Sequence, residues 1–208
     1  ITLEGLVDHA DSLGAAGRYG DGDVQWMTAG KGIQHAEMFP LLKNKEENPL
    51  ELLQIWLNLP KRSKFVEPCY KMLWHEDLPV INLEEKGESK GMVRVISGNF
   101  MDVKALDSTP DSWAADPGNE VGIWIIKLEE GGFVDLPEAS GEVTRAIYYY
   151  NGGNIDINGT QLPAGKQATI KADTPIRITN SKNVSDFLIV QGKPINEPVA
   201  QYGPFVMN

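Results

Sequence analysis

The chain of 208 residues is long enough to bury one large β domain or two small ones. Hydrophobic residues make up 41% of it and charged residues 23%, a composition typical of globular proteins that excludes a disordered chain. The formal net charge of −10, from 29 acidic residues against 19 lysines and arginines, repels phosphate backbones and anionic lipids. We therefore expect no direct binding to nucleic acid and none to a membrane.

The cysteine content and the chain ends bear on the compartment. Cys69 is the only cysteine, so no intrachain disulfide can form, which agrees with a reducing environment. We expect a cytoplasmic protein, with the nucleus as a second compartment if the source is eukaryotic. The chain begins with ITLEG, without a methionine, and ends with GPFVMN. These ends predict a fragment or a processed chain, so targeting cannot be read from them.

Short extended segments dominate the chain from end to end. They are rich in β-branched and aromatic residues, and Gly, Pro, Asn or Asp bracket most of them: 23–28, 51–59, 92–97, 121–128, 144–150 and 186–192. Asn158-Gly159, within NIDINGTQL, predicts a hairpin with a type I′ turn. No stretch keeps a 3.6-residue period for long, and the 13 prolines disfavour long helices. The sequence therefore predicts an all-β protein.

Two halves of the chain resemble each other. The polar stretch DSTPDSWAADPGNE, residues 107–120, is the best linker candidate and separates residues 1–106 from residues 107–208. Residues 20–37 align without gaps with residues 163–180, and the order of strand, turn, strand, glycine turn and strand recurs. An internal duplication of a small β-barrel explains this pattern. The alternative is a chance similarity between two β-rich segments.

His35 and Glu37 stand two positions apart in GKGIQHAEMF, directly after a glycine-rich turn. Side chains alternate faces along a strand, so both point the same way, and a buried carboxylate needs a partner or a metal. The aligned positions of the second half hold Ile178 and Asn180, which are poor ligands for a transition metal. The pattern predicts part of a metal site in the first half only, with iron as the best fit and manganese, copper or nickel as alternatives. The competing interpretation is an outward-facing pair on a solvated strand.

The other candidate residues have weaker patterns. His9, in LVDHADS, lies on the hairpin before the strand of His35; it can approach the site, but a local hydrogen bond is the favoured interpretation. His75, in the charged stretch LWHED, is expected at the surface. Trp26, Met27 and Gln54 are candidates for a substrate pocket near the metal, with core packing as the alternative for the first two.

Several motifs together resemble the pirin family, a branch of the bicupins: GDVQWMTAGKGIQHAEM, LQIWLNLP, VEPCY and the closing GPFVMN. The resemblance covers essentially the whole chain and implies two antiparallel β-barrels of the double-stranded β-helix, or jelly-roll, type, the first with a single iron ion. The family's ligands are a His-x-His pair, a third histidine and a glutamate, and His35 and Glu37 match the last two. We expect the His-x-His pair before Ile1; by the repeat it would align near Ser140 and Glu142. With two of the four family ligands, this chain is expected to hold the metal weakly or to be metal-free.

The resemblance also implies an organisation and a function. Residues 1–106 would form the metal-binding cupin barrel, without its first strands, and residues 107–208 a cupin barrel without metal ligands. The implied activity is that of a quercetin 2,3-dioxygenase-like oxidoreductase, which uses iron and O2 on a flavonol substrate, with Glu37 as general base. The alternative is an iron-responsive protein-binding module, a transcriptional coregulator that acts through protein partners and not directly on DNA. A metal-free β scaffold is the third interpretation.

Overall fold

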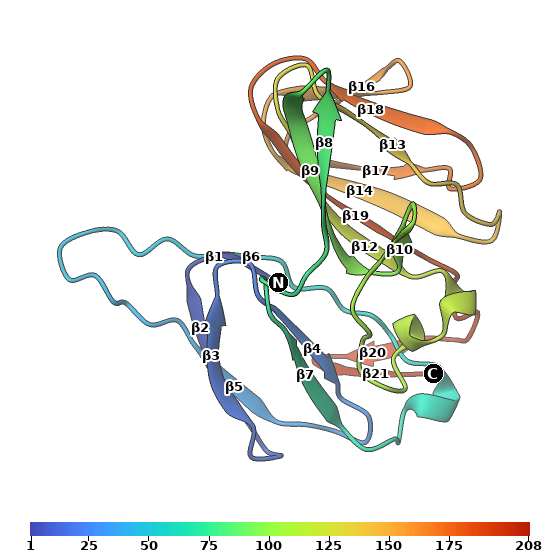
Figure 1. The fold of residues 1–208 in the computed structure, drawn as a ribbon. Helices are drawn as coiled ribbons and strands as arrows, with labels where there is room; N and C mark the ends of the chain where they lie inside the picture. Colours follow the sequence, from blue (N-terminus) through green and yellow to red (C-terminus); the bar gives the residue numbers. More distant parts are fainter. The chain divides into compact units, whose positions relative to one another are not determined.

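The computed structural model describes residues 1–208, which form 21 β-strands and three short 3₁₀ helices, with no α-helix (Figure 1). The all-β prediction is therefore confirmed. No helix in the structure has the length and apolar character needed to cross a membrane.

The chain forms two compact units, each assembled from separate stretches. Unit 1 consists of Ile1–Asp77, Asp107–Ala115 and Ile195–Asn208, and unit 2 consists of Leu78–Leu106 and Asp116–Pro194. The expected boundary between residues 106 and 107 coincides with one of the points at which the chain passes from one unit to the other. The structure assigns the stretches before and after this boundary differently from the expectation. Residues 78–106 belong to unit 2 because their strands pair there, and residues 195–208 return to unit 1.

Unit 1 contains small antiparallel sheets. A three-stranded sheet has the order β3-β2-β5, and the remaining strands form pairs, β1 with β6, β4 with β7 and β20 with β21. The bounds are β1 (Thr2–Glu4), β2 (Leu6–Asp11), β3 (Ala16–Gly20), β4 (Val24–Thr28), β5 (His35–Met38), β6 (Glu51–Leu52), β7 (Cys69–Leu73), β20 (Ala200–Tyr202) and β21 (Phe205–Met207), with 3₁₀ helices η1 (Lys61–Ser63) and η2 (Trp113–Ala115).

Unit 2 contains two larger sheets and a short strand pair, β10 with β11. The six-stranded sheet has the order β17-β14-β19-β12-β9-β8 and the four-stranded sheet the order β13-β18-β15-β16. The bounds are β8 (Val80–Glu85), β9 (Glu88–Ser97), β10 (Asn99–Phe100), β11 (Val103–Lys104), β12 (Gly122–Leu128), β13 (Phe133–Leu136), β14 (Thr144–Asn151), β15 (Asn154–Ile157), β16 (Thr160–Pro163), β17 (Lys166–Ile170), β18 (Ile176–Asn180) and β19 (Ser185–Gly192), with the 3₁₀ helix η3 (Pro117–Asn119).

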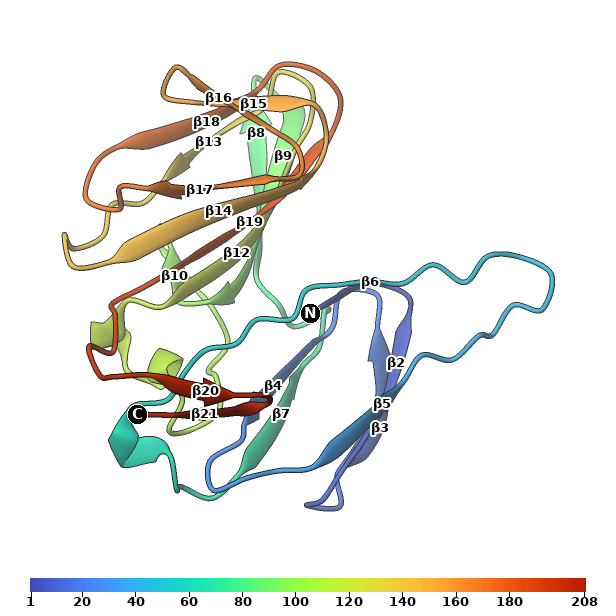
Figure 2. The same cartoon turned by 180° about the vertical axis from the view of Figure 1, so that it is seen from behind.

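The hydrophobic core of unit 2 lies between its two sheets, which face each other in both views (Figures 1 and 2). Trp124 and Ile126 enter it from β12, and Ile155 and Ile178 enter it from the four-stranded sheet; all four are fully buried. Phe100 meets Trp124 edge to face at 5.1 Å between ring centroids. Each such side chain contributes about 1.5–3 kcal/mol by leaving water, so this core holds the two sheets together.

The same strand order recurs in the two units. The β3-β2-β5 sheet of unit 1 corresponds to β16-β15-β18 of unit 2, in both cases a hairpin whose first strand pairs with a later strand. The type I′ turn is confirmed, because Asn158 and Gly159 both have positive φ, +48° and +89°. The duplication inferred from the sequence therefore has a counterpart in the strand order.

The prediction of a long strand over residues 51–59 is mostly wrong. Only Glu51–Leu52 pair with β1, and residues 53–60 belong to no strand. An alternation of apolar residues indicates which side chains are buried, but a strand also needs a neighbouring strand with free backbone N–H and C=O groups. That neighbour is not encoded in the segment itself.

Candidate metal centre

His35 and Glu37 lie on β5, one of the two edge strands of the β3-β2-β5 sheet. The glycine turn before β5 depends on Gly30, which has a left-handed φ of +49°. A Cβ at Gly30 would collide with the backbone carbonyl of Val66, so only glycine fits here. The turn thus depends on the close approach of the Gly30 backbone to Val66.

Strand pairing adds β2 to the site. In the antiparallel register His9 lies opposite Glu37, and Asp11 lies opposite His35. Residues that are directly opposite in a ladder share a face of the sheet, and so do residues two apart on one strand. The four side chains therefore lie on one face.

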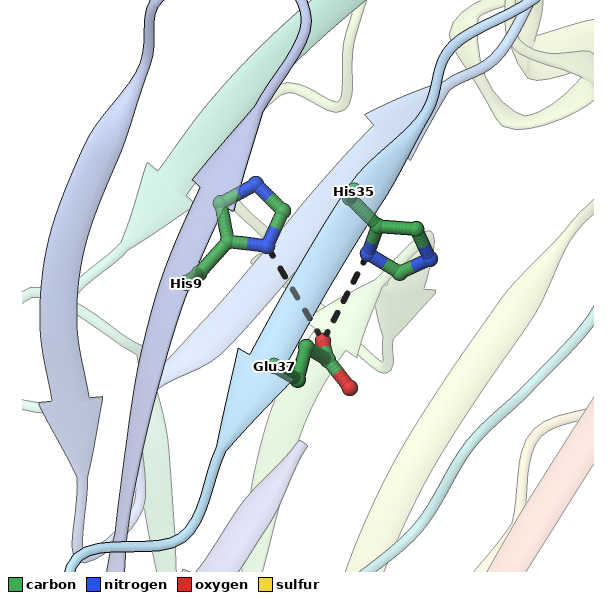
Figure 3. A group of neighbouring side chains, drawn as sticks. All are labelled: His9, His35 and Glu37. Carbon is green, nitrogen blue, oxygen red and sulfur yellow. Dashed lines mark ion pairs between the residues drawn. The ribbon is translucent and has the colours of Figure 1, made fainter.

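Three of these side chains present donor atoms to a common region (Figure 3). Nδ1 of His9 lies 4.0 Å from Oε1 of Glu37, and Nδ1 of His35 lies 3.9 Å from the same oxygen. The three donor atoms are all within 4.8 Å of one another. The second carboxylate oxygen of Glu37 points away from both imidazoles (Figure 3). Burial falls from His9, whose side chain is 0% exposed, through Glu37 at 23% to His35 at 35%, so the cluster opens to solvent on the His35 side.

Asp11 determines which nitrogen of His9 is available. Its Oδ2 lies 3.2 Å from Nε2 of His9, and both side chains are 0% exposed. An ionised carboxylate accepts a hydrogen bond and has no proton to donate, so in the neutral imidazole Nε2 carries the hydrogen and Nδ1 has the lone pair. The lone pair of Nδ1 is then free for a metal, the arrangement in which a carboxylate orients a ligating histidine from behind.

Two tyrosines border the cluster. The hydroxyl of Tyr19, on β3, lies 3.2 Å from Oε1 of Glu37. Burial, followed by the negative charge of Glu37, raises the pKa of Tyr19 far above its ordinary value, so the phenol stays protonated and can donate. The ring of Tyr70, on β7, stacks on His9 with 5.2 Å between centroids and 17° between planes. This stacking limits the rotation of the His9 ring.

The residues present fit a transition metal. Nδ1 of His9 is buried and has no hydrogen-bond partner, which costs about 1–3 kcal/mol unless something occupies the position it faces. Two imidazoles and one carboxylate form the donor set of non-haem Fe(II) facial triads, which leave open coordination positions. The two further histidines that the family resemblance implies remain a prediction.

The other expected site residues lie in different places. Trp26 and Met27 are neighbours on β4 and therefore face opposite sides of it; Met27 shares its side with Tyr70, its partner in the ladder, whereas Trp26 pairs with Lys71. Gln54 is exposed, beyond the end of β6.

His75 is half exposed, as expected, and approaches Asp23 and Glu76. That second cluster carries its own hydrogen bonds, because Asp23 accepts from the backbone N–H of Gly20 and of His75.

Sequence reasoning gave His9 a local hydrogen bond, and the structure has that bond, to Asp11. The approach of His9 to the site was the less favoured alternative, and in the structure Nδ1 of His9 lies 4.0 Å from Oε1 of Glu37. Sequence reasoning missed Tyr19. The signal for His9 was the alternation of His9 with Asp11 on one strand, which becomes informative only when the pairing of β2 with β5 is known.

Comparisons with known proteins agree with this fold. The models of two families, Pirin and the Pirin C-terminal cupin domain, match residues 1–57 and 123–208. The crystal structure of a quercetin 2,3-dioxygenase from Acinetobacter baumannii superposes with a TM-score of 0.86 at 32% identity, covering 100% of this chain and 68% of that one. Pirin from Rattus norvegicus is 35% identical over 98% of this chain and 65% of its own length. A Pseudomonas aeruginosa protein with the provisional name quercetin 2,3-dioxygenase is 31% identical over 100% of this chain and 68% of its own.

Two related β units, one with a cluster of two histidines and a carboxylate, define a bicupin with a candidate metal centre in unit 1. The chain belongs to the pirin family, as its motifs indicated, and its relatives include quercetin 2,3-dioxygenases. It spans about two thirds of the length of the relatives compared above.

Proposed function

We propose that this chain belongs to a metal-dependent dioxygenase that acts on a flavonol such as quercetin, with one iron ion held by His9, His35 and Glu37. The observation that carries the proposal is the buried Nδ1 of His9, which has no hydrogen-bond partner and faces Glu37. The same oxygen of Glu37 also faces His35, so the three donor atoms lie close together. Not every lone pair in this group has a hydrogen-bond partner within it. Similarity to a quercetin 2,3-dioxygenase supports the reaction class.

The three residues and the metal would have different roles in the reaction. A bound iron ion would supply Lewis acidity toward the flavonol hydroxyl and an open position for O2. Glu37 is the candidate general base, because its second oxygen is directed away from the imidazoles and can accept the hydroxyl proton. His9 and His35 would hold the ion in position. Manganese, copper and nickel suit the same donors, so the identity of the metal is part of the test.

The substrate is proposed to lie on the open side of the cluster. His35 is the most exposed of the three donors, so approach is easiest beside it. Met27 and Tyr70 face the same side of their strand pair, and Tyr70 already contacts His9. A flat flavonol ring would pack against such apolar and aromatic side chains. Trp26 and Gln54 are not part of this proposed pocket.

The test is metal-dependent consumption of quercetin. The protein is stripped with a chelator, reloaded with Fe(II), Mn(II), Cu(II) or Ni(II), and mixed with quercetin while absorbance and O2 uptake are recorded. We expect turnover with at least one metal, O2 uptake that matches quercetin loss, and neither in the stripped protein. His35→Ala should abolish both while circular dichroism stays unchanged, because His35 lies at the surface of an edge strand. A protein that loads one metal fully and leaves quercetin intact would contradict the proposal.

A second candidate is the protein-binding module. Unit 1 exposes several large apolar side chains, with Trp56, Phe65, Tyr202 and Phe205 each 59–87% exposed. Where such side chains form one contiguous patch, they are typical of a site where another protein binds. Full metal loading without turnover would favour this candidate, whose partner would be a protein and not nucleic acid, given the net charge of −10.

A further inference from the structure

Tyr19 is a buried tyrosine whose hydroxyl ends at the candidate metal centre. It is 6% exposed, and its hydroxyl lies 3.2 Å from Oε1 of Glu37 and 3.1 Å from Oε1 of Gln25. Both neighbours are acceptors, whereas a phenol has one proton to donate. An ionised carboxylate forms the stronger hydrogen bond, so the proton goes to Glu37.

Gln25 can complete this arrangement. Its Nε2 is buried and forms no hydrogen bond with Tyr19, and the Gln25 side chain also interacts with the hydroxyl of Tyr70. Rotation of the amide by 180° exchanges Nε2 and Oε1 without changing the shape of the side chain. Nε2 then donates to the Tyr19 oxygen, and the Tyr19 proton is left for Glu37. The result is a chain of donors from Gln25 through Tyr19 to Glu37 in which the phenol no longer lies between two acceptors.

The Tyr19 hydroxyl contacts the Glu37 oxygen that faces both imidazoles. Tyr19 approaches Oε1 of Glu37, the same atom that faces Nδ1 of His9 and Nδ1 of His35. Apart from these two imidazoles, Tyr19 is the only side chain that contacts the Glu37 carboxylate through a polar group. Glu37 sits on an edge strand and its side chain has three rotatable bonds, so without this bond the carboxylate would have several accessible orientations.

We propose that Tyr19 is a positioning residue for a divalent transition metal: its hydroxyl holds the Glu37 carboxylate so that Oε1 faces the donor nitrogens of His9 and His35. The proposal rests on the proposed function in that the ion is the one assigned there to these three residues. Tyr19 itself does not touch the ion. It acts through Glu37, and loss of such a supporting hydrogen bond lowers metal affinity about 10–100-fold.

The experiment compares metal binding by the wild type and by Tyr19→Phe. Stripped protein is titrated with Ni(II) against a competing chelator, and separately loaded with Co(II) for visible absorption spectra. Tyr149→Phe is the matched control, since it removes another buried phenol hydroxyl, 2.8 Å from Oγ of Ser185 in unit 2. We expect about a 10–100-fold loss of Ni(II) affinity and altered Co(II) bands for Tyr19→Phe, and wild-type affinity and bands for Tyr149→Phe.

A double-mutant cycle separates positioning from a general loss of packing. Gln25→Leu should weaken Ni(II) binding in the wild type and have a smaller further effect in the Tyr19→Phe background, because Gln25 supports Glu37 through Tyr19 and also interacts with Tyr70. If Tyr19→Phe does not fold, a weaker Ni(II) affinity of folded Gln25→Leu supports the proposal and an unchanged affinity overturns it. Wild-type affinity and spectra for folded Tyr19→Phe would also overturn it, while leaving the metal centre intact. A wild-type protein that binds no metal would overturn the centre itself and this proposal with it.

Discussion

Asp11→Asn isolates the hydrogen bond that orients His9. Oδ2 of Asp11 lies 3.2 Å from Nε2 of His9, while Oδ1 accepts from the backbone N–H groups of Leu13 and Ala15. Asparagine keeps the shape and can leave its oxygen with the turn, but it then presents an NH₂ donor to Nε2. The favoured tautomer of His9 becomes the one with its proton on Nδ1, the nitrogen that faces Glu37. The substitution therefore blocks a metal-binding lone pair without removing the ring.

The magnitude follows from the burial of this pair. Loss of the group that orients a ligating histidine lowers metal affinity about 10–100-fold, or about 1.4–2.7 kcal/mol. Both side chains are 0% exposed, so water cannot take the place of Asp11, and we expect the upper half of that range. The turn keeps its two backbone hydrogen bonds, so the free energy of unfolding should fall by only about 0.5–1.5 kcal/mol.

The assay is titration of stripped protein with Ni(II) against a chelator, alongside urea unfolding. Asp8→Asn is the matched control, because Asp8 lies on the same strand but the opposite face and pairs with Arg18 at the surface. Such exposed pairs contribute little to stability and this one has no contact with the donors, so Asp8→Asn should keep wild-type affinity. Equal Ni(II) affinities for the two variants would refute the assignment of His9 as a donor.

Three further predictions test the base, the core and an ion pair. Glu37→Gln keeps the size of the side chain but loses the charge and the basic oxygen, so quercetin turnover should disappear while the urea midpoint changes little; turnover at the wild-type rate would rule out Glu37 as the base. Ile178→Ala, at a fully buried position of unit 2, should lower the free energy of unfolding by about 2–5 kcal/mol and leave Ni(II) affinity unchanged, and a smaller loss would contradict the packing described for that core. Arg177 lowers the pKa of Asp135 through a direct hydrogen bond, so the pair stabilises the fold above the unfolded pKa of Asp135 and the contribution fades as pH falls through the lower, folded value. Asp135→Asn should therefore reduce the difference in stability between pH 6 and pH 3, and an unchanged difference would show that the pair is not formed in solution.

Part of the site could be predicted from one strand alone. His35 and Glu37 are two apart, and alternation places them on one face whatever the strand pairs with. The comparison with Ile178 and Asn180 was equally local, and the structure shows what the second unit does at those positions. Ile178 is in the core, and the Asn180 amide donates to the backbone carbonyls of Leu128 and Glu129, among others.

What could not be predicted depends on pairing between distant strands. His9 comes to Glu37 only through the register of β2 with β5, and Tyr19 only through the hairpin that adds β3. The compact units differ from the expected boundary for the same reason. The apolar alternation in β9 would suit any sheet with a free edge. The pairing of β9 with β12 and β8 in unit 2 depends on the whole fold.

The central claim is that His9, His35 and Glu37 share one metal ion. The most direct measurement is an anomalous difference map at the iron absorption edge, from crystals of protein loaded with Fe(II) under nitrogen. The account predicts one strong peak within bonding distance of Nδ1 of His9, Nδ1 of His35 and Oε1 of Glu37, and its loss in crystals of Glu37→Gln. A peak bound elsewhere, for example beside Asp23 and His75, or no peak at these three donors in iron-loaded crystals, would contradict it.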